Sequence, residues 1–330
     1  MNEVVVTRKR FAAGKIGELR NLGLVAVLVA LAVVGAVTKP DQFLRVDNVV
    51  LILTLSSIIG VITVGMTFVI IGGGIDLSVG AVVALSTVWA TTKATQSYGI
   101  VGIVFCALAV GVGAGLVSGL LIAYGRLVAF IGTLAMLASA RGLAIQLSQG
   151  KTQTVTFKNQ SLVDLGYKKS YILGIPPLVI IFVVVAVIGW FLLNRTTFGR
   201  RTFAIGGNPE AARLAGIDVR RHTLLLYVLS GLCCGIASVM LIILTSSGTS
   251  ANGNLYELDA IAAVIIGGTL LSGGRGTLVG SVLGVLVFTT ISDLFTLNNL
   301  STAVQQITKG LIIVVAVLIQ RRAAAERTSP

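Results

Sequence analysis

Among the residues that could carry chemistry, Asp76 stands alone inside a long apolar stretch. It follows three glycines, residues 72–74, and comes two positions before Ser78. A carboxylate at such a place can cap the helix that follows, and acids within membrane segments are costly and usually functional. A structural cap and direct contact with a solute therefore both remain open for Asp76. The hydroxyls of Ser78 and Thr67 either contact such a solute or bond their own helix backbone.

The other reactive side chains form no catalytic or metal-binding set in the sequence. His222 is the single histidine, and the three cysteines lie inside apolar runs, which indicates neither a metal site nor a disulfide framework. No nucleophile with a matching base suggests an enzyme. The phosphate-binding pattern G-x-x-x-x-G-K-S/T is absent, so ATP is not expected to bind in that way. We expect no catalytic residue, no metal and no cofactor on this chain.

Five further charged residues fall within or beside apolar runs. Asp293 and Lys309 flank a turn, so a salt bridge across the resulting hairpin is expected, with contact to a solute as the alternative. Arg141 is expected to extend toward the outer end of its span. Glu257 and Asp259 are expected to begin a helix on the outer side.

Composition defines the class of protein that carries these residues. Of 330 residues, 55% are hydrophobic and 11% are charged, and the mean hydropathy is +0.98. These values predict an all-α polytopic membrane protein with membrane lipid around it. The net charge of +13 does not indicate nucleic acid, because the basic residues are scattered over loops, where they set membrane topology.

Ten apolar runs are candidate membrane spans, most of them near the roughly 20 residues that a crossing needs. With the N-terminus inside, 16 Lys and Arg residues lie in cytoplasmic segments and 7 in outer loops, which favours a cytoplasmic N-terminus and C-terminus. We expect a cytoplasmic leader (1–21), one transmembrane domain (22–320) and a cytoplasmic tail (321–330). The runs are 22–37, 49–71, 77–92, 100–123, 128–147, 172–193, 223–245, 258–271, 277–297 and 303–319.

Two of these runs, 77–92 and 258–271, are short, and each adjoins a cluster of glycines. The sequence VIIGG at 69–73 recurs at 264–268, an offset of 195 that suggests an internal duplication. Paired short spans interrupted by glycine predict broken helices at a translocation site. The alternative is close helix packing through small residues. The predicted pathway residues are Thr67, Gly72, Gly73, Gly74, Asp76, Ser78, Gly267 and Gly268.

The longest polar interruption is a basic segment, residues 198–222. Asn208, Pro209 and Glu210 are typical of a helix start, which predicts a short helix over about 209–215 that ends at Gly216. Surrounding arginines place this segment in the cytoplasm. A helix this short needs a partner surface, and the alternative is an interfacial helix that lies on the lipid headgroups.

Three motifs give the chain a specific resemblance. AIGGNPEAARLAGI (204–217), VGMTFVIIGGGIDLSVGAVVALS (64–86) and ELDAIAAVIIGGTLLSGGRGTLVGSVLG (257–284) occur in this order. Together they resemble the permease family of bacterial ABC sugar importers of the ribose, xylose, arabinose and galactose type, over residues 48–321. The resemblance implies that residues 204–217 are a coupling helix that docks on a separate ATPase subunit. The coupling residues would be Ala204, Gly206, Gly207, Asn208, Ala211, Ala212, Ala215, Gly216 and Ile217.

The same resemblance implies the function and the partners. The chain would be a permease of the bacterial plasma (inner) membrane that moves a monosaccharide or similar polar solute inward, and not an enzyme. ATP and Mg would bind the ATPase subunit, an extracytoplasmic sugar-binding protein would deliver the solute, and a second permease copy or paralogue would complete the pathway. The outer loop 148–171, with four lysines, is either solvated or docks an acidic binding protein. The alternative function is a secondary, ion-coupled transporter, which would normally carry more intramembrane acids than Asp76.

Overall fold

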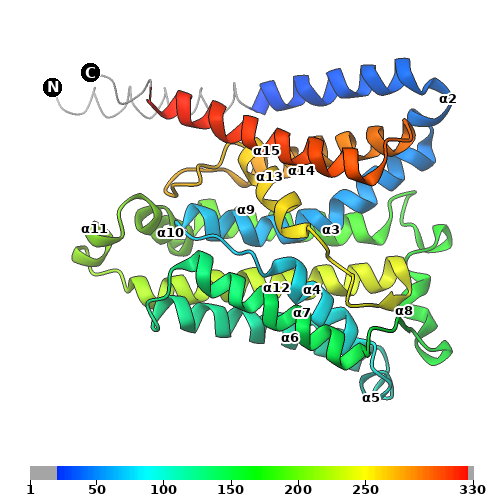
Figure 1. The fold of residues 1–330 in the computed structure, drawn as a ribbon, viewed down its shortest axis with the longest axis horizontal. Helices are drawn as coiled ribbons and strands as arrows, with labels where there is room; N and C mark the ends of the chain where they lie inside the picture. The colour runs from blue at the N-terminus through cyan, green and yellow to red at the C-terminus, as the bar shows by residue number, and fades with distance from the viewer. Residues whose placement is uncertain (1–20, 326–330) are drawn as a thin grey trace.

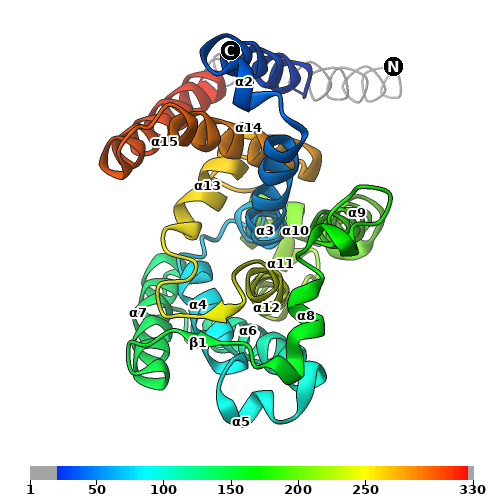
Figure 2. The same ribbon diagram turned by 90° about the vertical axis from the view of Figure 1, so that its right-hand side faces the viewer.

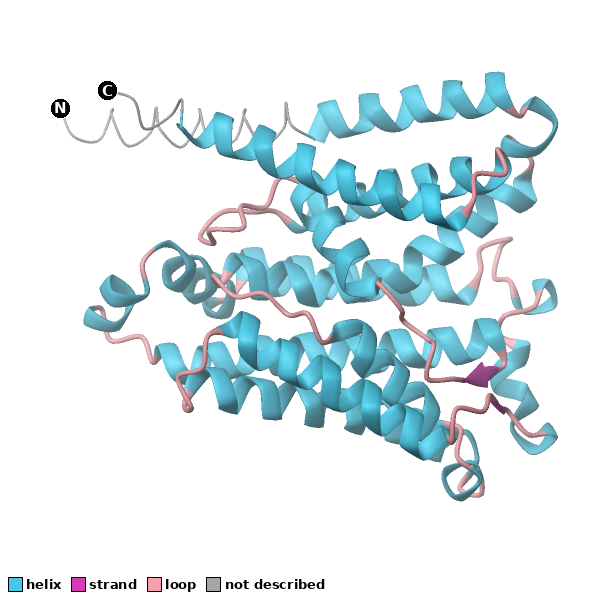
Figure 3. Cartoon of the chain, in the orientation of Figure 1, coloured by secondary structure: helices cyan, strands magenta, loops and turns pink. Residues whose placement is uncertain are grey.

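The computed structural model describes residues 21–325, with side chains described as far as residue 318. Apart from Asn21, the predicted leader lies outside the described residues. Of the predicted tail, only the backbone of residues 321–325 is described. The fold is almost entirely helical, as Figure 3 shows, and the two short strands lie together at one side of the view.

Each of the ten predicted spans coincides with a helix, so the all-α polytopic fold class is confirmed. Seven of these helices are long and apolar enough to cross a membrane. Two of the others, α4 and α13, are the short helices that the glycine clusters predicted. The ten helices are Asn21–Thr38, α3 (Val46–Ile71), α4 (Val79–Ala90), α6 (Gly99–Ala123), α7 (Ala129–Ser148), α9 (Pro177–Arg195), α12 (Val219–Thr245), α13 (Tyr256–Ile266), α14 (Leu278–Leu297) and α15 (Thr302–Ala325).

Shorter elements connect these helices. The strands β1 (Gln153–Thr154) and β2 (Ser247–Gly248) pair antiparallel, with Gln153 opposite Gly248, and join two loops that are distant in the sequence. The remaining elements are α2 (Pro40–Phe43), α5 (Lys93–Gln96), η1 (Phe157–Asn159), α8 (Gln160–Asp164), η2 (Lys168–Ser170), α10 (Thr197–Gly207) and α11 (Pro209–Leu214).

The long helices run side by side, so the molecule has two ends (Figure 1). One end carries α10 and α11 and lies at the left of Figure 1; we call it the α11 end. The other carries α5 and α8, and we call it the α8 end. These two ends correspond to the two faces that a membrane-spanning bundle presents to water.

The core of the bundle is built around α3 and α12. Between residues 56 and 71, α3 is buried at every position except Ile59. Helix α12 packs tightly against α6 because glycines face each other there: a methyl group at Gly111 would lie 2.3 Å from the carbonyl oxygen of Gly231. This is the close packing through small residues that helix contacts in membranes favour.

The expected salt bridge between Asp293 and Lys309 is wrong. Lys309 Nζ lies 3.2 Å from Asp259 Oδ1, whereas Asp293 accepts a hydrogen bond of 3.0 Å from the Asn48 side chain. The reason is packing: α15 lies against α13, and α14 lies against α3, so the two side chains face different neighbours.

Candidate functional site

The first interruption lies between the end of α3 and the start of α4. The N–H of Gly73 donates to the carbonyl of Ile70, and the N–H of Gly74 donates to that of Val69, both at 2.9 Å. Gly73 has a φ of +84°, which glycine adopts without strain and which ends many helices. Residues 74–78 then continue without helical structure until α4 begins at Val79.

The second glycine pair repeats this ending at the C-terminus of α13. The N–H of Gly268 donates to Ile265 at 2.8 Å, and that of Thr269 donates to Val264 at 3.1 Å. Gly268 has a φ of +80°. The sequence repeat at an offset of 195 therefore folds into the same helix ending at both places.

The two short helices meet at their N-termini. Helix α13 begins after an irregular segment, residues 249–255, with Glu257 and Asp259 in its first turn. The sequence predicted a helix start here but placed it on the outer side, whereas this start lies against the first turn of α4. A methyl group at Gly80, in the first turn of α4, would lie 2.2 Å from the carbonyl oxygen of Gly253 and 2.3 Å from Glu257 Oε2. Only glycine allows this approach of the two segments.

From this junction, the two short helices run to opposite ends of the bundle. Helix α4 ends beside the α8 end, where Thr91 Oγ1 lies 3.3 Å from Gln153 Oε1. Helix α13 leads to the α11 end, where Gly274 contacts Gly207. Their 12 and 11 residues correspond to about 18 Å and about 16 Å of helix. Each therefore covers roughly half of the ~30 Å hydrocarbon layer, and their junction lies near its middle.

Asp76 is buried between α4 and α12. It accepts hydrogen bonds from the N–H of Ser78 at 3.0 Å, from Ser78 Oγ at 2.6 Å and from Ser230 Oγ of α12 at 2.8 Å. Ser78 is the N-cap residue of α4, so the carboxylate holds the residue at the helix start rather than an N–H inside the helix. The arrangement agrees with a structural role for Asp76 and extends it, because the same carboxylate ties α4 to α12.

The other predicted pathway residues lie on both sides of this carboxylate. The hydroxyl of Thr67 is buried and donates to the carbonyl of Thr63 in its own helix at 2.6 Å. Gly267 lies against α14, where a methyl group would be 2.5 Å from the carbonyl of Gly280. For Gly267, close packing is therefore a sufficient reason for glycine. Close helix packing is the alternative that the sequence left open for these glycines.

The basic segment folds into two helices, of which the sequence predicted only the second. Helix α11 has the expected start, because Asn208 Oδ1 accepts the N–H of Ala211 at 2.9 Å, and it ends before Gly216, whose φ is +82°. Helix α10 precedes it, and its N-terminus is capped by Thr196, whose hydroxyl accepts the N–H of Phe198 at 3.2 Å. Its arginine and glycine content gave no clear helical signal in the sequence.

Most of the predicted coupling residues lie on the surface of this helix pair. Ala212 is buried, and Gly206 and Ile217 are partly buried. Sequence reasoning missed Leu214, a large apolar side chain at the end of α11 that is 80% exposed. Because α11 lies at one end of the bundle (Figure 1), Leu214 is accessible to a partner at that end. The exposed members of the predicted set are Ala204, Gly207, Asn208, Ala211, Ala215 and Gly216.

The α10 helix contacts both interrupted helices at the α11 end. Gly206 lies on the end of α3: a methyl group there would clash with the carbonyl oxygen of Ile71. That carbonyl also accepts the N–H of Gly274 at 2.8 Å. Gly273 completes the contact, since a methyl group on it would lie 2.9 Å from the Cα of Gly73. The predicted coupling segment thus touches the end of α3 and the loop after α13 through backbone, with no side chains between them.

A second contact anchors α10 to the start of α12. His222 Nε2 lies 2.9 Å from Thr202 Oγ1, and its ring lies 4.5 Å from that of Phe198. Beside this contact is a polar hollow of about 380 Å³. Sequence reasoning gave His222 no role, because only the fold places it opposite Thr202. The hollow is lined by Arg201, Gly216, Asp218, Arg221, His222 and Leu225.

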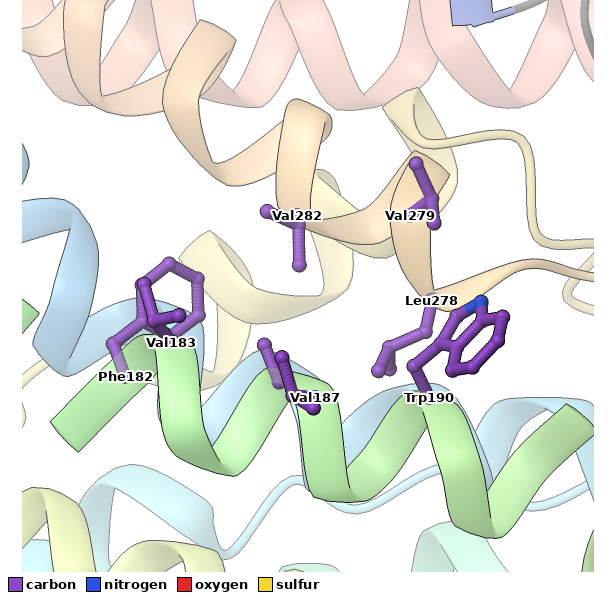
Figure 4. Close-up of a pocket in the computed structure, with 8 residues that line it drawn as sticks. Phe182, Val183, Val187, Trp190, Leu278, Val279 and Val282 are labelled. Atoms are coloured by element: carbon purple, nitrogen blue, oxygen red, sulfur yellow. The ribbon is translucent and has the colours of Figure 1, made fainter. Parts of the chain in front are cut away.

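An apolar groove of about 410 Å³ lies between α9 and α14 (Figure 4). None of the eight predicted pathway residues lines it. Such walls suit the acyl chains of lipid and offer no convergent polar groups to a polar solute. The lining residues are Phe182, Val183, Ala186, Val187, Trp190, Leu278, Val279 and Val282.

The lysine-rich loop at the α8 end has part of its charge neutralised. Lys168 pairs with Asp47 at 2.6 Å, and Lys169 pairs with Asp164 at 2.9 Å. Lys158 donates to the carbonyl of Ser97 at 3.2 Å. Docking of an acidic partner on this loop stays a prediction.

Comparison with known proteins identifies relatives over nearly the full length. A family model described as "Branched-chain amino acid transport system / permease component" matches residues 48–317. The chain is 40% identical over 309 residues to the ribose import permease protein RbsC of Bacillus subtilis (strain 168), covering 94% of this chain and 95% of that protein.

Two further relatives have similar coverage. The Escherichia coli (strain K12) ribose import permease protein RbsC is 35% identical over 320 residues, which is 97% of this chain and 98% of that protein. The L-arabinose ABC transporter permease protein AraH of Azospirillum brasilense is 38% identical over 311 residues, or 94% of this chain and 90% of that protein. No solved structure matches the chain.

Proposed function

We propose that this chain, which belongs to the family of transport-system permease components, is the membrane-spanning subunit of an ATP-driven importer. By the names of its relatives, its solute is a monosaccharide or a similar small polar molecule, carried into the cytoplasm. The chain is the transport subunit and not an enzyme. ATP and Mg bind a separate ATPase subunit.

The observation that carries this proposal is the contact of α10 with both interrupted helices. A force applied to α11 passes through α10 to the end of α3 at Ile71 and to the loop at Gly273 and Gly274. These two places lead directly into α4 and α13, which meet near the middle of the bundle. A motion of the ATPase can therefore change the junction of the two short helices without breaking the core around α12.

The coupling surface is the exposed part of residues 204–217 together with Leu214. Its backbone is open at Gly207, where a methyl group would have nothing within 4 Å, and Leu214 supplies an apolar side chain. An ATPase groove that covers these atoms would bury Leu214. Glu210 and Arg213 of α11 form an exposed ion pair on the same surface.

The predicted pathway residues shape the inner part of the route rather than bind the solute through their hydroxyls. Thr67 and Ser78 already use their hydroxyls inside the protein. Gly72 to Gly74, Gly267 and Gly268 fix where the helices end, and Asp76 fixes where α4 begins. These positions set the angle at which α4 and α13 meet.

The orientation and the partners follow from the same account. The α11 end, with its arginines, faces the cytoplasm of a bacterium, and both termini lie on that side of the plasma (inner) membrane. The extracytoplasmic sugar-binding protein docks at the α8 end. A second permease copy or a close paralogue completes the pathway, and each copy carries one ATPase subunit.

Co-purification from the native membrane tests the assembly. The tagged chain, extracted in mild detergent, is expected to bring down an ATPase subunit whose ATP hydrolysis rises when the sugar-binding protein is added with D-ribose or L-arabinose. The Leu214→Glu variant is the matched control and should lose the ATPase while it still inserts. Recovery of the wild-type chain without any ATPase would contradict the proposal.

A further inference from the structure

A row of four charged side chains crosses three helices on one side of the bundle. Arg141 comes from α7, Glu257 and Asp259 come from the first turn of α13, and Lys309 comes from α15. Figure 2 shows α15, α13 and α7 one after another along the left-hand side of the molecule. None of the four belongs to the pathway or coupling residues described above.

The four side chains carry two positive and two negative charges, and one positive and one negative charge form an ion pair. Lys309 Nζ lies 3.2 Å from Asp259 Oδ1. The guanidinium of Arg141 donates to the carbonyl of Asn252 at 2.9 Å. Asn252 belongs to the irregular segment that leads into α13, so Arg141 is held at the junction of the two short helices, near the first turn of α13 that carries Glu257.

The row lies inside the membrane region and not at its surface. Arg141 is seven residues before the end of α7, and Lys309 is seven residues after the start of α15. Both are therefore about 10 Å from the α8 end, measured along their helices. The first turn of α13 lies at the inner end of a half-length helix, deeper than either loop.

This face is not closed by the chain itself. The side chain of Lys309 is 24% exposed, and Leu258, which lies between the two acids in sequence, is 43% exposed. Charged side chains within membrane segments face a protein interior or a water-filled cavity and not lipid tails. A face that carries four of them is therefore expected to border protein or water and not lipid tails.

Glu257 has hydrogen-bonding capacity that the described residues do not use. Its Oε2 atom is buried and accepts no hydrogen bond within the part of the chain that the structure describes. It rests over Gly80, where a side chain would exclude it. A buried carboxylate oxygen without a donor is unfavourable, and a hydroxyl donor brought by a solute would relieve this.

We propose that Arg141, Glu257 and the Asp259–Lys309 pair form the solute-contact site of the pathway, and that this site takes a neutral polyhydroxylated solute. Carboxylates accept from hydroxyl groups and a guanidinium donates to them, so the row can follow the hydroxyls of a sugar. The four charges sum to zero, which gives an ion no net attraction. The inference rests on the proposed function and adds the residues and the solute class to it.

Uptake kinetics of the reconstituted importer test the site. The complete complex, purified with its ATPase and binding protein, is placed in proteoliposomes with ATP, and uptake of radiolabelled D-ribose, L-arabinose and L-leucine is measured. Glu257→Gln keeps the shape of the side chain and removes its charge, so it should raise the KM for the transported sugar by about tenfold or more.

Asp293→Asn is the matched control, because Asp293 is also a carboxylate within a helix but bonds Asn48 on another face. Its sugar KM should equal that of the wild type. A wild-type KM in Glu257→Gln, or faster uptake of L-leucine than of either sugar by the wild type, overturns the inference. A wild-type complex that hydrolyses ATP but carries no monosaccharide refutes the proposed function itself.

Cysteine labelling decides the matter if Glu257→Gln does not assemble. In a Cys106→Ser background, Leu258→Cys should react with a membrane-impermeant thiosulfonate reagent, and the transported sugar should slow that reaction. Val187→Cys, in the apolar groove of Figure 4, is the control and should stay unlabelled. An unreactive Leu258→Cys, or labelling that neither sugar slows, overturns the assignment.

Discussion

At the scale of single residues, Asp76 links the start of α4 to α12 through hydrogen bonds to its carboxylate. Its carboxylate receives three hydrogen bonds from two residues, Ser78 before α4 and Ser230 in α12. An acid can accept all three at once, whereas an amide has only one acceptor oxygen. The sequence left cap and solute contact open for Asp76, and the geometry supports the first.

Replacing Asp76 separates these two roles. Asp76→Asn should retain much of the uptake, because the amide oxygen still accepts from Ser78. Asp76→Leu should lose uptake and lower the free energy of unfolding by roughly 1–3 kcal/mol for each hydroxyl left without a partner. Thermal unfolding in detergent and uptake assays measure the two effects. Equal loss of uptake in both variants, with unchanged stability in Asp76→Asn, would show that the charge itself is required.

At the scale of elements, the junction of α4 and α13 depends on the absence of one side chain. Gly80→Ala would place a methyl group 2.2 Å from the carbonyl oxygen of Gly253. Separating the two helices to make room should cost about 1–3 kcal/mol or more and abolish uptake.

Gly113→Ala in α6 is the control for that substitution, because a methyl group there meets nothing within 4 Å. Alanine in the interior of a helix is favoured over glycine by about 1 kcal/mol, so this variant should be neutral or more stable. If the Gly80→Ala variant took up sugar and folded as well as the Gly113→Ala variant, the close contact at the junction would be refuted.

The proposed coupling segment contains two adjacent glycines, Gly206 and Gly207, with different surroundings. A side chain at Gly207 is free in this chain, whereas one at Gly206 meets the carbonyl oxygen of Ile71. Gly207→Glu should therefore keep wild-type thermal stability and lose uptake, because only the ATPase contact is blocked. Gly206→Ala should lose both thermal stability and uptake. Sugar uptake at the wild-type rate in Gly207→Glu would remove the coupling role from this surface.

Much of this architecture could be predicted from local sequence signals. The ten helices followed from the length of the apolar runs, and α11 followed from Asn208, Pro209 and Gly216, since caps act within a few residues. The partner of Lys309 could not be predicted, because α15 packs against α13, which carries Asp259, and Asp293 faces another helix. The approach of Glu257 to Gly80 was hidden for the same reason: the two residues are 177 positions apart.

At the scale of the whole molecule, the two short helices divide the bundle between its ends. Helix α4 runs toward the α8 end and α13 runs toward the α11 end (Figure 1). The backbone of α10 contacts the end of α3, which precedes α4, and the loop that follows α13. Short helices that meet near the middle of the membrane are a common design of solute carriers. In the proposed function this design is combined with a surface for an external ATPase, so that ATP hydrolysis replaces an ion gradient as the source of energy.

The most direct test of the whole account is the energy source of uptake. The complete complex, in proteoliposomes with its binding protein and radiolabelled D-ribose or L-arabinose, should accumulate one of these sugars when ATP is supplied to the ATPase side. It should not do so under a proton or sodium gradient alone. Accumulation under a gradient without ATP, by the chain free of any ATPase, would contradict the account and identify a secondary transporter.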